Sequence, residues 1–169
     1  MVKTAAATSP GLISSQSATT PAEINSLWAA RKQLSPALRR IAPKKINEDV
    51  VVPVANIPAL IEYIENLSIH YQIPIVNFGH AGNGNIHVNL LIDPSNKIQV
   101  ENETKCLSDL FDKVLALEGT LSGEHGVGIE KRDYIDREIM PVALNLMRQI
   151  KSSFDPKGIL NPDKIFPLK

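Results

Sequence analysis

The chain has 169 residues, enough for one domain with an apolar core and flanking tails. Its 18 basic and 18 acidic residues cancel, so bulk charge favours neither nucleic acid nor an anionic membrane surface as a partner. No apolar run reaches the length of a transmembrane helix. The single cysteine, Cys106, excludes an internal disulfide.

The first part of the sequence predicts a tail and then a helix. Residues 1–20 are rich in Ser, Thr and Ala without the compact apolar segment of a signal peptide, so we expect a disordered tail or the scar of a truncated start. Thr20-Pro21-Ala22-Glu23 is a capping box, which predicts a helix from Pro21. Helical spacing puts Arg31 on its apolar face, with Ser35 one turn further along. Arg31 there either extends to the surface or binds an anion.

The rest of the chain alternates strand and helix patterns. In order, we expect a strand over 46–54 entering at Asp49, a helix of about 14 residues capped by Asn56, strands over 73–80 and 85–92, a helix over 98–117, a short strand over 120–122 and a helix over 138–153. The helix over 98–117 predicts a buried thiol for Cys106. This order predicts an α+β fold, an antiparallel sheet with helices on one face.

The strands over 73–80 and 85–92 carry two of the four histidines. Asn83-Gly84 between them is a strong signal for a two-residue type I′ turn. Counting outward from that turn puts His80 directly opposite His87, with Cβ atoms about 4.5–5.5 Å apart, close enough to share a metal ion. Strand alternation places Asn89 on the same face as His87.

A second glycine-rich segment contains Glu124 and His125. In extended backbone, neighbouring side chains point in opposite directions, so we assign Glu124 to a metal and His125 to a substrate. The flanking glycines allow the backbone to approach a ligand closely. Two histidines and a carboxylate leave open positions on a metal ion, as in metal sites that perform chemistry.

Simpler interpretations remain for each pattern taken alone. His80 and His87 could form an ordinary cross-strand pair, and Glu124-His125 among glycines could be a turn. Their joint occurrence beside a predicted hairpin favours the metal site.

Three ordered segments resemble a known family: Phe78-Gly79-His80-Ala81-Gly82-Asn83-Gly84-Asn85-Ile86-His87, Gly119-Thr120-Leu121-Ser122-Gly123-Glu124-His125-Gly126-Val127-Gly128 and Phe154-Asp155-Pro156-Lys157-Gly158-Ile159-Leu160-Asn161-Pro162. Together they are similar to the C-terminal part of FAD-linked 2-hydroxyacid dehydrogenases and oxidases of the vanillyl-alcohol-oxidase superfamily. That group includes glycolate oxidase subunits, D-lactate dehydrogenases and D-2-hydroxyglutarate dehydrogenases. The resemblance covers about residues 21–167. It implies a ferredoxin-like cap domain over 21–153 and a flavin-contacting tail over 154–169.

The resemblance also implies roles for individual residues. The implied ligands of a divalent zinc, iron or manganese ion are His80, His87 and Glu124. His125 matches the histidine that takes the hydroxyl proton as hydride passes to flavin. The implied substrate-binding residues are Arg31, Ser35, Asn89 and His125, and the implied flavin-contacting residue is Asn161. A substrate lysine falls at Lys44 or Lys45, between which the resemblance does not decide.

The resemblance implies an enzyme that needs a further part. FAD would be bound mainly by an N-terminal domain for which this chain has no room, so we expect an FAD-binding domain or subunit as partner. The substrate would be a D-2-hydroxyacid of the lactate, glycolate or 2-hydroxyglutarate class, and the electron acceptor stays open. We expect a cytoplasmic protein, with any membrane contact made through partners. The alternative is a metal-binding but catalytically inert fragment or module without the FAD domain.

Overall fold

The computed structural model describes residues 12–167, which fall into two compact units divided after Arg40. The N-terminal unit contains one helix, α2 (Pro21–Leu38), and residues 12–19 before it form no helix or strand. Thr20 and Glu23 form the predicted capping box, which confirms the predicted helix start. The rest of the predicted tail, residues 1–11, lies outside the described residues, and the predicted domain boundaries stay predictions.

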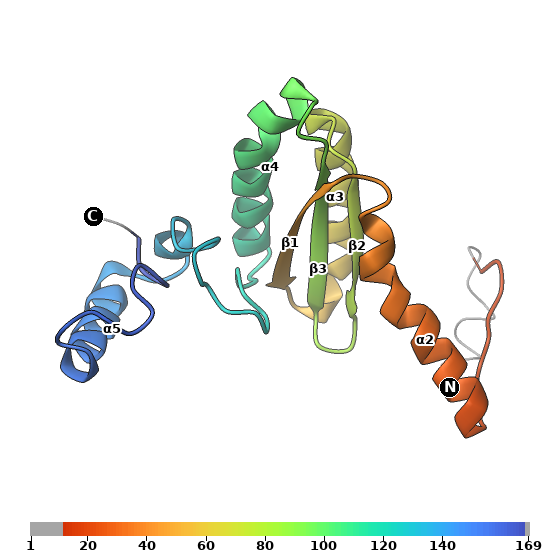
Figure 1. Ribbon diagram of the computed structural model, residues 1–169, viewed down its shortest axis with the longest axis horizontal. Coiled ribbons are helices and arrows are strands. Elements are labelled where there is room, and N and C mark those ends of the chain that lie inside the picture. Colours follow the sequence, from red (N-terminus) through yellow and green to blue (C-terminus); the bar gives the residue numbers. More distant parts are fainter. Residues whose placement is uncertain (1–11, 168–169) are drawn as a thin grey trace. The chain divides into compact units, whose positions relative to one another are not determined.

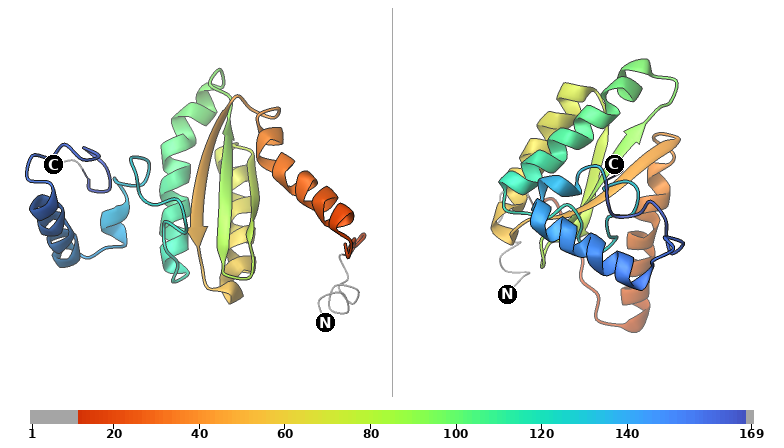
Figure 2. Two further views of the ribbon diagram at one scale, coloured as in Figure 1. Left: turned by 60° about the horizontal axis from the view of Figure 1, so that its bottom comes forward. Right: turned by 90° about the vertical axis from the view of Figure 1, so that its left-hand side faces the viewer.

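The second unit is built on a three-stranded antiparallel sheet with the strand order β1-β3-β2. Its strands are β1 (Lys44–Val51), β2 (Ile75–His80) and β3 (Asn85–Ile92). Two helices, α3 (Ile57–Tyr71) and α4 (Lys97–Ala116), lie side by side on one face of this sheet (Figures 1 and 2). The predicted α+β class is confirmed. The strand expected over 120–122 is only an isolated bridge between Val51 and Thr120.

The core lies between the sheet and the two helices. Every residue of the central strand β3 is buried, and polar and apolar side chains alternate from Asn85 to Leu90. The helices contribute an apolar stripe each, and the largest fully buried side chains include Leu60, Ile64, Leu110 and Phe111. Asn96 begins α4 by accepting hydrogen bonds from the N–H groups of Ile98 and Gln99. Cys106 is fully buried in this core, as predicted, and burial raises the pKa of its thiol to about 12.

Two predicted elements of this region differ in detail. Asn56, at the end of a 3-10 turn, η1 (Val54–Asn56), holds the predicted N-cap position of the 15-residue α3, but its side chain makes no capping hydrogen bond. Its amide instead donates to the carbonyl oxygen of Leu117, tying the start of α3 to the end of α4. Strand β1 also begins and ends earlier than expected, at Lys44 and Val51.

The hairpin between β2 and β3 has a different register from the predicted one. His80 pairs with Asn85, and Phe78 pairs with His87, so the turn spans four residues, 81–84. Local hydrogen bonds close this wider turn: the N–H of Asn83 donates to the carbonyl oxygen of His80 at 3.1 Å, and Asn83 Oδ1 accepts from the N–H of Asn85 at 3.2 Å. The carbonyl oxygen of Gly84 accepts a hydrogen bond from the N–H of Val52, at 3.1 Å.

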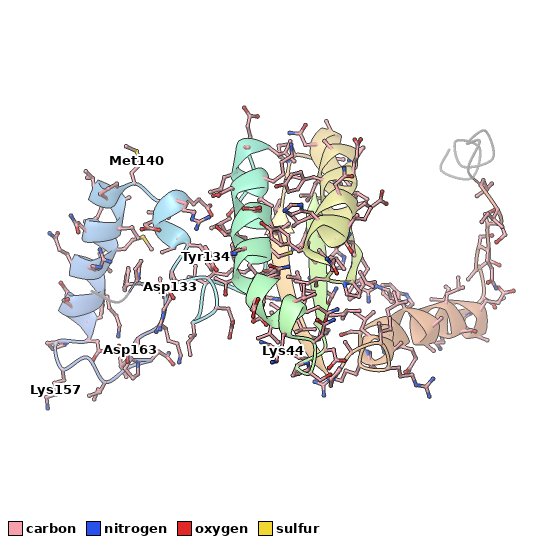
Figure 3. All side chains as sticks on the ribbon, turned by 90° about the horizontal axis from the view of Figure 1, so that it is seen from above. Lys44, Asp133, Tyr134, Met140, Lys157 and Asp163 are labelled. Atoms are coloured by element: carbon pink, nitrogen blue, oxygen red, sulfur yellow. The ribbon has the colours of Figure 1, made fainter. Side chains whose placement is uncertain are left out.

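The chain after the bridge at Thr120 continues through η2 (Ile135–Arg137) into α5 (Pro141–Phe154), close to the helix predicted over 138–153. Tyr134 lies against α4 (Figure 3), with its ring centroid 4.8 Å from that of Phe111. After α5, the carboxylate of Asp155 accepts hydrogen bonds from the N–H groups of Ile159 and Leu160. This carboxylate therefore shapes the C-terminal segment.

Replacing Gly84 by alanine should destabilise the protein, whereas the same change at Gly82 should not. Gly84 has φ +79°, and a Cβ there would lie 1.9 Å from the carbonyl oxygen of Val52, while a Cβ at Gly82 meets nothing within 4 Å. We expect Gly84→Ala to lower the free energy of unfolding by at least about 1 kcal/mol in urea denaturation. Gly82→Ala should change it by less than about 0.5 kcal/mol. Equal losses in the two variants would contradict this hairpin geometry.

Candidate metal centre and active site

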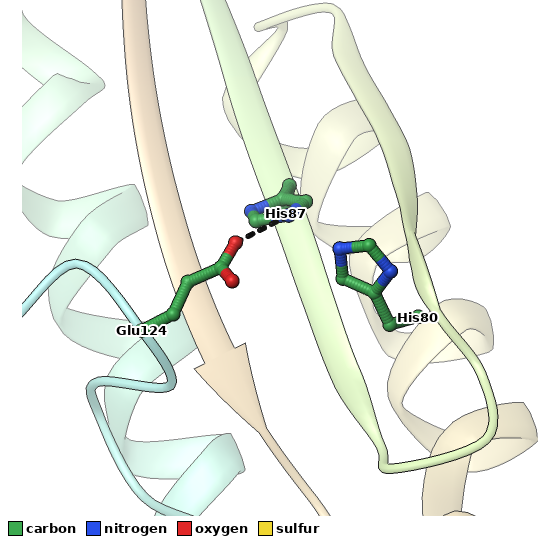
Figure 4. A group of neighbouring side chains, drawn as sticks. All are labelled: His80, His87 and Glu124. Carbon is green, nitrogen blue, oxygen red and sulfur yellow. Dashed lines mark ion pairs between the residues drawn. The ribbon is translucent and has the colours of Figure 1, made fainter. Parts of the chain in front are cut away.

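Three candidate ligands converge at one end of the sheet. His80 ends β2, His87 lies in β3 and Glu124 lies in the loop after Thr120 (Figure 4). Each offers one ligand atom, and these three atoms lie within 4.8 Å of one another. Among the described residues this is the one group of three or more His, Cys, Asp or Glu side chains that could hold a metal ion. The structure thus brings together the residues predicted as metal ligands, despite the changed hairpin register.

The donor set suits a divalent transition metal. His87 Nε2 and Glu124 Oε1 are 3.3 Å apart. A tetrahedral zinc ion with bonds of about 2.0–2.1 Å holds its ligand atoms about 3.4 Å apart, so this pair already has the required spacing. The rings of His80 and His87 lie edge to face, with centroids 5.6 Å apart. A small movement of the exposed His80 would complete a three-ligand site with open positions.

Burial of His87 favours the neutral imidazole, which is the form that binds a metal. Its side chain is 8% exposed, and loss of solvent lowers the pKa of the imidazole. Glu124 opposes this shift, while the neighbouring His125 and His80 lower the pKa further. A lowered pKa keeps the ring neutral at neutral pH, and a metal needs the lone pair of the neutral ring.

His125 lies beside the candidate ligands. Its ring stacks on that of His87, with centroids 5.4 Å apart, and its Nε2 is 3.9 Å from Glu124 Oε1. The expectation that Glu124 and His125 point in opposite directions is therefore wrong, because the backbone bends between Gly123 and Gly126. The side chain of His125 is 43% exposed, so it remains accessible to a substrate.

A buried carboxylate holds this loop. Asp49 is fully buried, and its Oδ2 accepts hydrogen bonds from the backbone N–H groups of Glu124 and His125. Its Oδ1 accepts one from Lys131 Nζ at 2.6 Å, and Lys131 also donates to the carbonyl oxygen of Asp49 at 2.8 Å. Burial alone would raise the pKa of Asp49, but these hydrogen bonds lower it below its usual value, which favours the charged form.

A second buried carboxylate shares the same ammonium group. Glu48 Oε2 lies 3.4 Å from Lys131 Nζ, farther than Asp49. Burial raises the pKa of Glu48, although Lys131 opposes that shift. Asp49 is thus the ionised partner of Lys131. Neither Glu48 nor Asp49 was predicted as a site residue; the available signal was an acidic pair directly before the β-branched run 50–52.

The other end of the loop is also anchored by a carboxylate. Glu138 accepts hydrogen bonds from the hydroxyl of Thr120, at 2.6 Å, and from the N–H of Leu121, at 2.9 Å. Glycine at position 123 lets the loop backbone pass close to Asn85, because a Cβ there would lie 2.3 Å from Asn85 Nδ2. The segment that carries Glu124 and His125 is therefore fixed on both sides.

Three further residues with a predicted substrate role, Asn89 and the alternatives Lys44 and Lys45, lie on strands of the sheet. Asn89 is fully buried, and its amide nitrogen donates to the carbonyl oxygens of Val76 and His87. Its Oδ1 has no hydrogen-bond partner among the described residues. The β1–β3 register puts Lys45 on this face, whereas Lys44 pairs with Glu103 of α4 at 2.7 Å.

Two further sets of predicted residues lie elsewhere. Arg31 and Ser35 are one turn apart in α2, in the N-terminal unit. Asn161 lies in the C-terminal segment with φ +46°. Substrate binding by Arg31, Ser35 and Asn89 and flavin contact by Asn161 stay predictions.

Comparison with known proteins identifies the family. Residues 2–165 match the family described as FAD linked oxidases, C-terminal domain. The chain belongs to this family. It is 38% identical to the glycolate oxidase subunit GlcD of Bacillus subtilis (strain 168), a match covering 91% of this chain and 33% of that protein. It is 37% identical to the D-2-hydroxyglutarate dehydrogenase of Stutzerimonas stutzeri (strain A1501), over 85% of this chain and 32% of that protein.

A vertebrate protein is also similar. The probable mitochondrial D-lactate dehydrogenase of Danio rerio is 33% identical, over 84% of this chain and 29% of that protein. The chain therefore spans about a third of the length of these relatives. Within the described residues, no helix is both long and apolar enough to span a membrane. The cytoplasmic location stays a prediction from the sequence.

Replacing His80 by alanine should weaken metal binding by more than about tenfold, because loss of a direct ligand costs at least as much as loss of an outer contact. The probe is Co²⁺, titrated into the purified chain and followed by its visible absorption. His70→Ala is the matched control, since His70 is an exposed histidine of α3 whose ring contacts Tyr71. Equal weakening in both variants, or no Co²⁺ binding by the wild type, would contradict the metal site.

Proposed function

We propose that this chain is part of an FAD-dependent oxidoreductase that converts a D-2-hydroxyacid of the lactate, glycolate or 2-hydroxyglutarate class to the 2-oxoacid. The observation that carries the proposal is the convergence of His125 with the candidate ligands His80, His87 and Glu124. Family membership supports the redox chemistry, and the names of the relatives support the substrate class.

The chemistry is divided between bound groups and side chains. A bound divalent metal supplies charge stabilisation for the substrate's hydroxyl oxygen, and bound FAD supplies the hydride acceptor. His80, His87 and Glu124 would hold the metal. His125 would take the hydroxyl proton, because it is exposed beside the ligands while remaining outside the three-ligand group.

Other residues would bind the substrate. Arg31 would pair with its carboxylate, as a planar guanidinium can do with two hydrogen bonds, and Ser35 would assist one turn away. Lys45 is the better candidate for the substrate lysine, because the register puts it on the face of Asp49 and His87. Asn89 would offer its unpaired Oδ1 as an acceptor.

The C-terminal segment supports a flavin-binding partner. Asn161 helps to line a hollow of about 310 Å³ next to α5 and would offer its amide to the flavin. Large apolar side chains of α5 and the following segment are exposed, including Val142, Phe154, Ile159 and Leu160. Met140, directly before α5, is exposed as well (Figure 3). Such a surface suits burial against an FAD-binding domain or subunit.

The test combines the chain with a candidate flavin-binding polypeptide. We expect 2-hydroxyacid-dependent dye reduction in the mixture, with D-lactate preferred to L-lactate among the acids tested. His125→Ala should lower kcat by about 10²–10⁴-fold, because it removes the proton acceptor. His70→Ala is the control for removal of a histidine that has no proposed role.

Two results would contradict the proposal. One is full activity in His125→Ala. The other is a mixture that binds metal and flavin but oxidises no 2-hydroxyacid. A chain that binds metal yet never acquires flavin would favour the alternative, a metal-binding module without redox activity.

A further inference from the structure

We propose that Asp49 is a positioning residue for this reaction, one that fixes the metal ligand Glu124 and the proton acceptor His125 through their backbone N–H groups. The inference rests on the proposed function for the roles of Glu124 and His125. The contacts of Asp49 are independent of those roles. Asp49 itself is fully buried, and its Oδ1 lies 3.7 Å from Nδ1 of the His125 side chain.

The first argument is the geometry of the loop. The N–H groups of two consecutive residues, Glu124 and His125, both point at Asp49 Oδ2. Successive N–H groups that converge in this way form a nest, a concave backbone site for an anion. Here the anion is a side chain of the protein. Because the two residues are neighbours, any shift of this nest moves the ligand and the acceptor together.

The second argument is the location of Asp49 in the sheet. The β1–β3 register places Asp49 directly opposite His87, the buried candidate ligand. The same carboxylate therefore ties the loop that carries Glu124 to the strand pair that carries His87. This tie would set the separation between His87 Nε2 and Glu124 Oε1, which is 3.3 Å.

The third argument is that Asp49 cannot turn away from the loop. Lys131 Nζ donates to both its Oδ1 and its backbone carbonyl oxygen. The side chain of Lys131 is 4% exposed and that of Asp49 is fully buried, so the two charges compensate each other away from solvent. Oδ1 of the carboxylate thus accepts from Lys131 and lies 3.7 Å from His125 Nδ1, while Oδ2 accepts the two N–H groups of the loop.

A matched pair of variants separates positioning from folding. Asp49→Val/Lys131→Met removes both buried charges and leaves no acceptor for the loop N–H groups. Asp49→Asn/Lys131→Met also removes both charges but retains an amide oxygen as acceptor. Replacing a buried ion pair by uncharged side chains usually permits folding, which thermal unfolding and near-ultraviolet circular dichroism would verify.

The main readout is Co²⁺ affinity of the folded chain. We expect the Val/Met variant to bind Co²⁺ about 10- to 100-fold more weakly than wild type, as is typical for loss of an outer contact at a metal site. The Asn/Met variant should recover much of that loss. Glu48→Gln is a further control, because Glu48 lies near Lys131 without bonding to the loop, and it should bind Co²⁺ as tightly as wild type.

A second readout needs no metal. In wild type the amide protons of Glu124 and His125 should exchange slowly with solvent; they should exchange fast in the Val/Met variant and slowly again in the Asn/Met variant. Equal Co²⁺ affinity and equal amide exchange in two folded double variants would overturn the proposal.

Co²⁺ binding and amide exchange together distinguish failure of the proposed function from failure of the positioning role of Asp49. If wild type bound no Co²⁺, the proposed metal chemistry would fail. Amide exchange would then still decide whether Asp49 positions Glu124 and His125. If wild type bound Co²⁺ and both double variants matched it in Co²⁺ affinity and in amide exchange, only the positioning role would fail.

Discussion

The site depends on one buried ion pair, between Asp49 and Lys131. Removing one member of such a pair typically costs about 3–5 kcal/mol, because the other charge is left buried without a partner. The pair also holds the backbone of the loop in place, because Asp49 accepts hydrogen bonds from the N–H groups of Glu124 and His125. Folding free energy and site geometry are therefore coupled at one carboxylate.

The sheet explains why this carboxylate can act on two segments. The central strand β3 pairs with β1 on one side and β2 on the other, and α3 and α4 cover one face of the sheet. The other face carries Asp49 and His87 as register partners, with His80 at the end of β2. The loop after Thr120 reaches them through the bridge to Val51 and the hydrogen bonds to Asp49. The β2–β3 hairpin and the loop held by Asp49 thus bring His80, His87 and Glu124 together.

Local signals in the sequence predicted local structure well. The capping box at Thr20 and Glu23, the apolar stripes of α3 and α4 and the strand alternation around His87 depend on neighbours in the chain. The hairpin register did not follow from Asn83-Gly84, because hydrogen bonds of Asn83 to His80 and Asn85 close a wider, four-residue turn. The ligands His80, His87 and Glu124 were predicted from the two glycine-rich segments and from the resemblance to the family. Asp49 and Lys131, 82 residues apart, interact only in the folded protein, so no local pattern could pair them.

The most direct test of the account is anomalous diffraction from crystals of the chain grown with Co²⁺, with data collected at the cobalt edge. The account predicts an ion bound by imidazole nitrogens of His80 and His87 and a carboxylate oxygen of Glu124, with His125 beside it and not bound to it. An ion bound elsewhere, or one bound by His125 in place of Glu124, would contradict it.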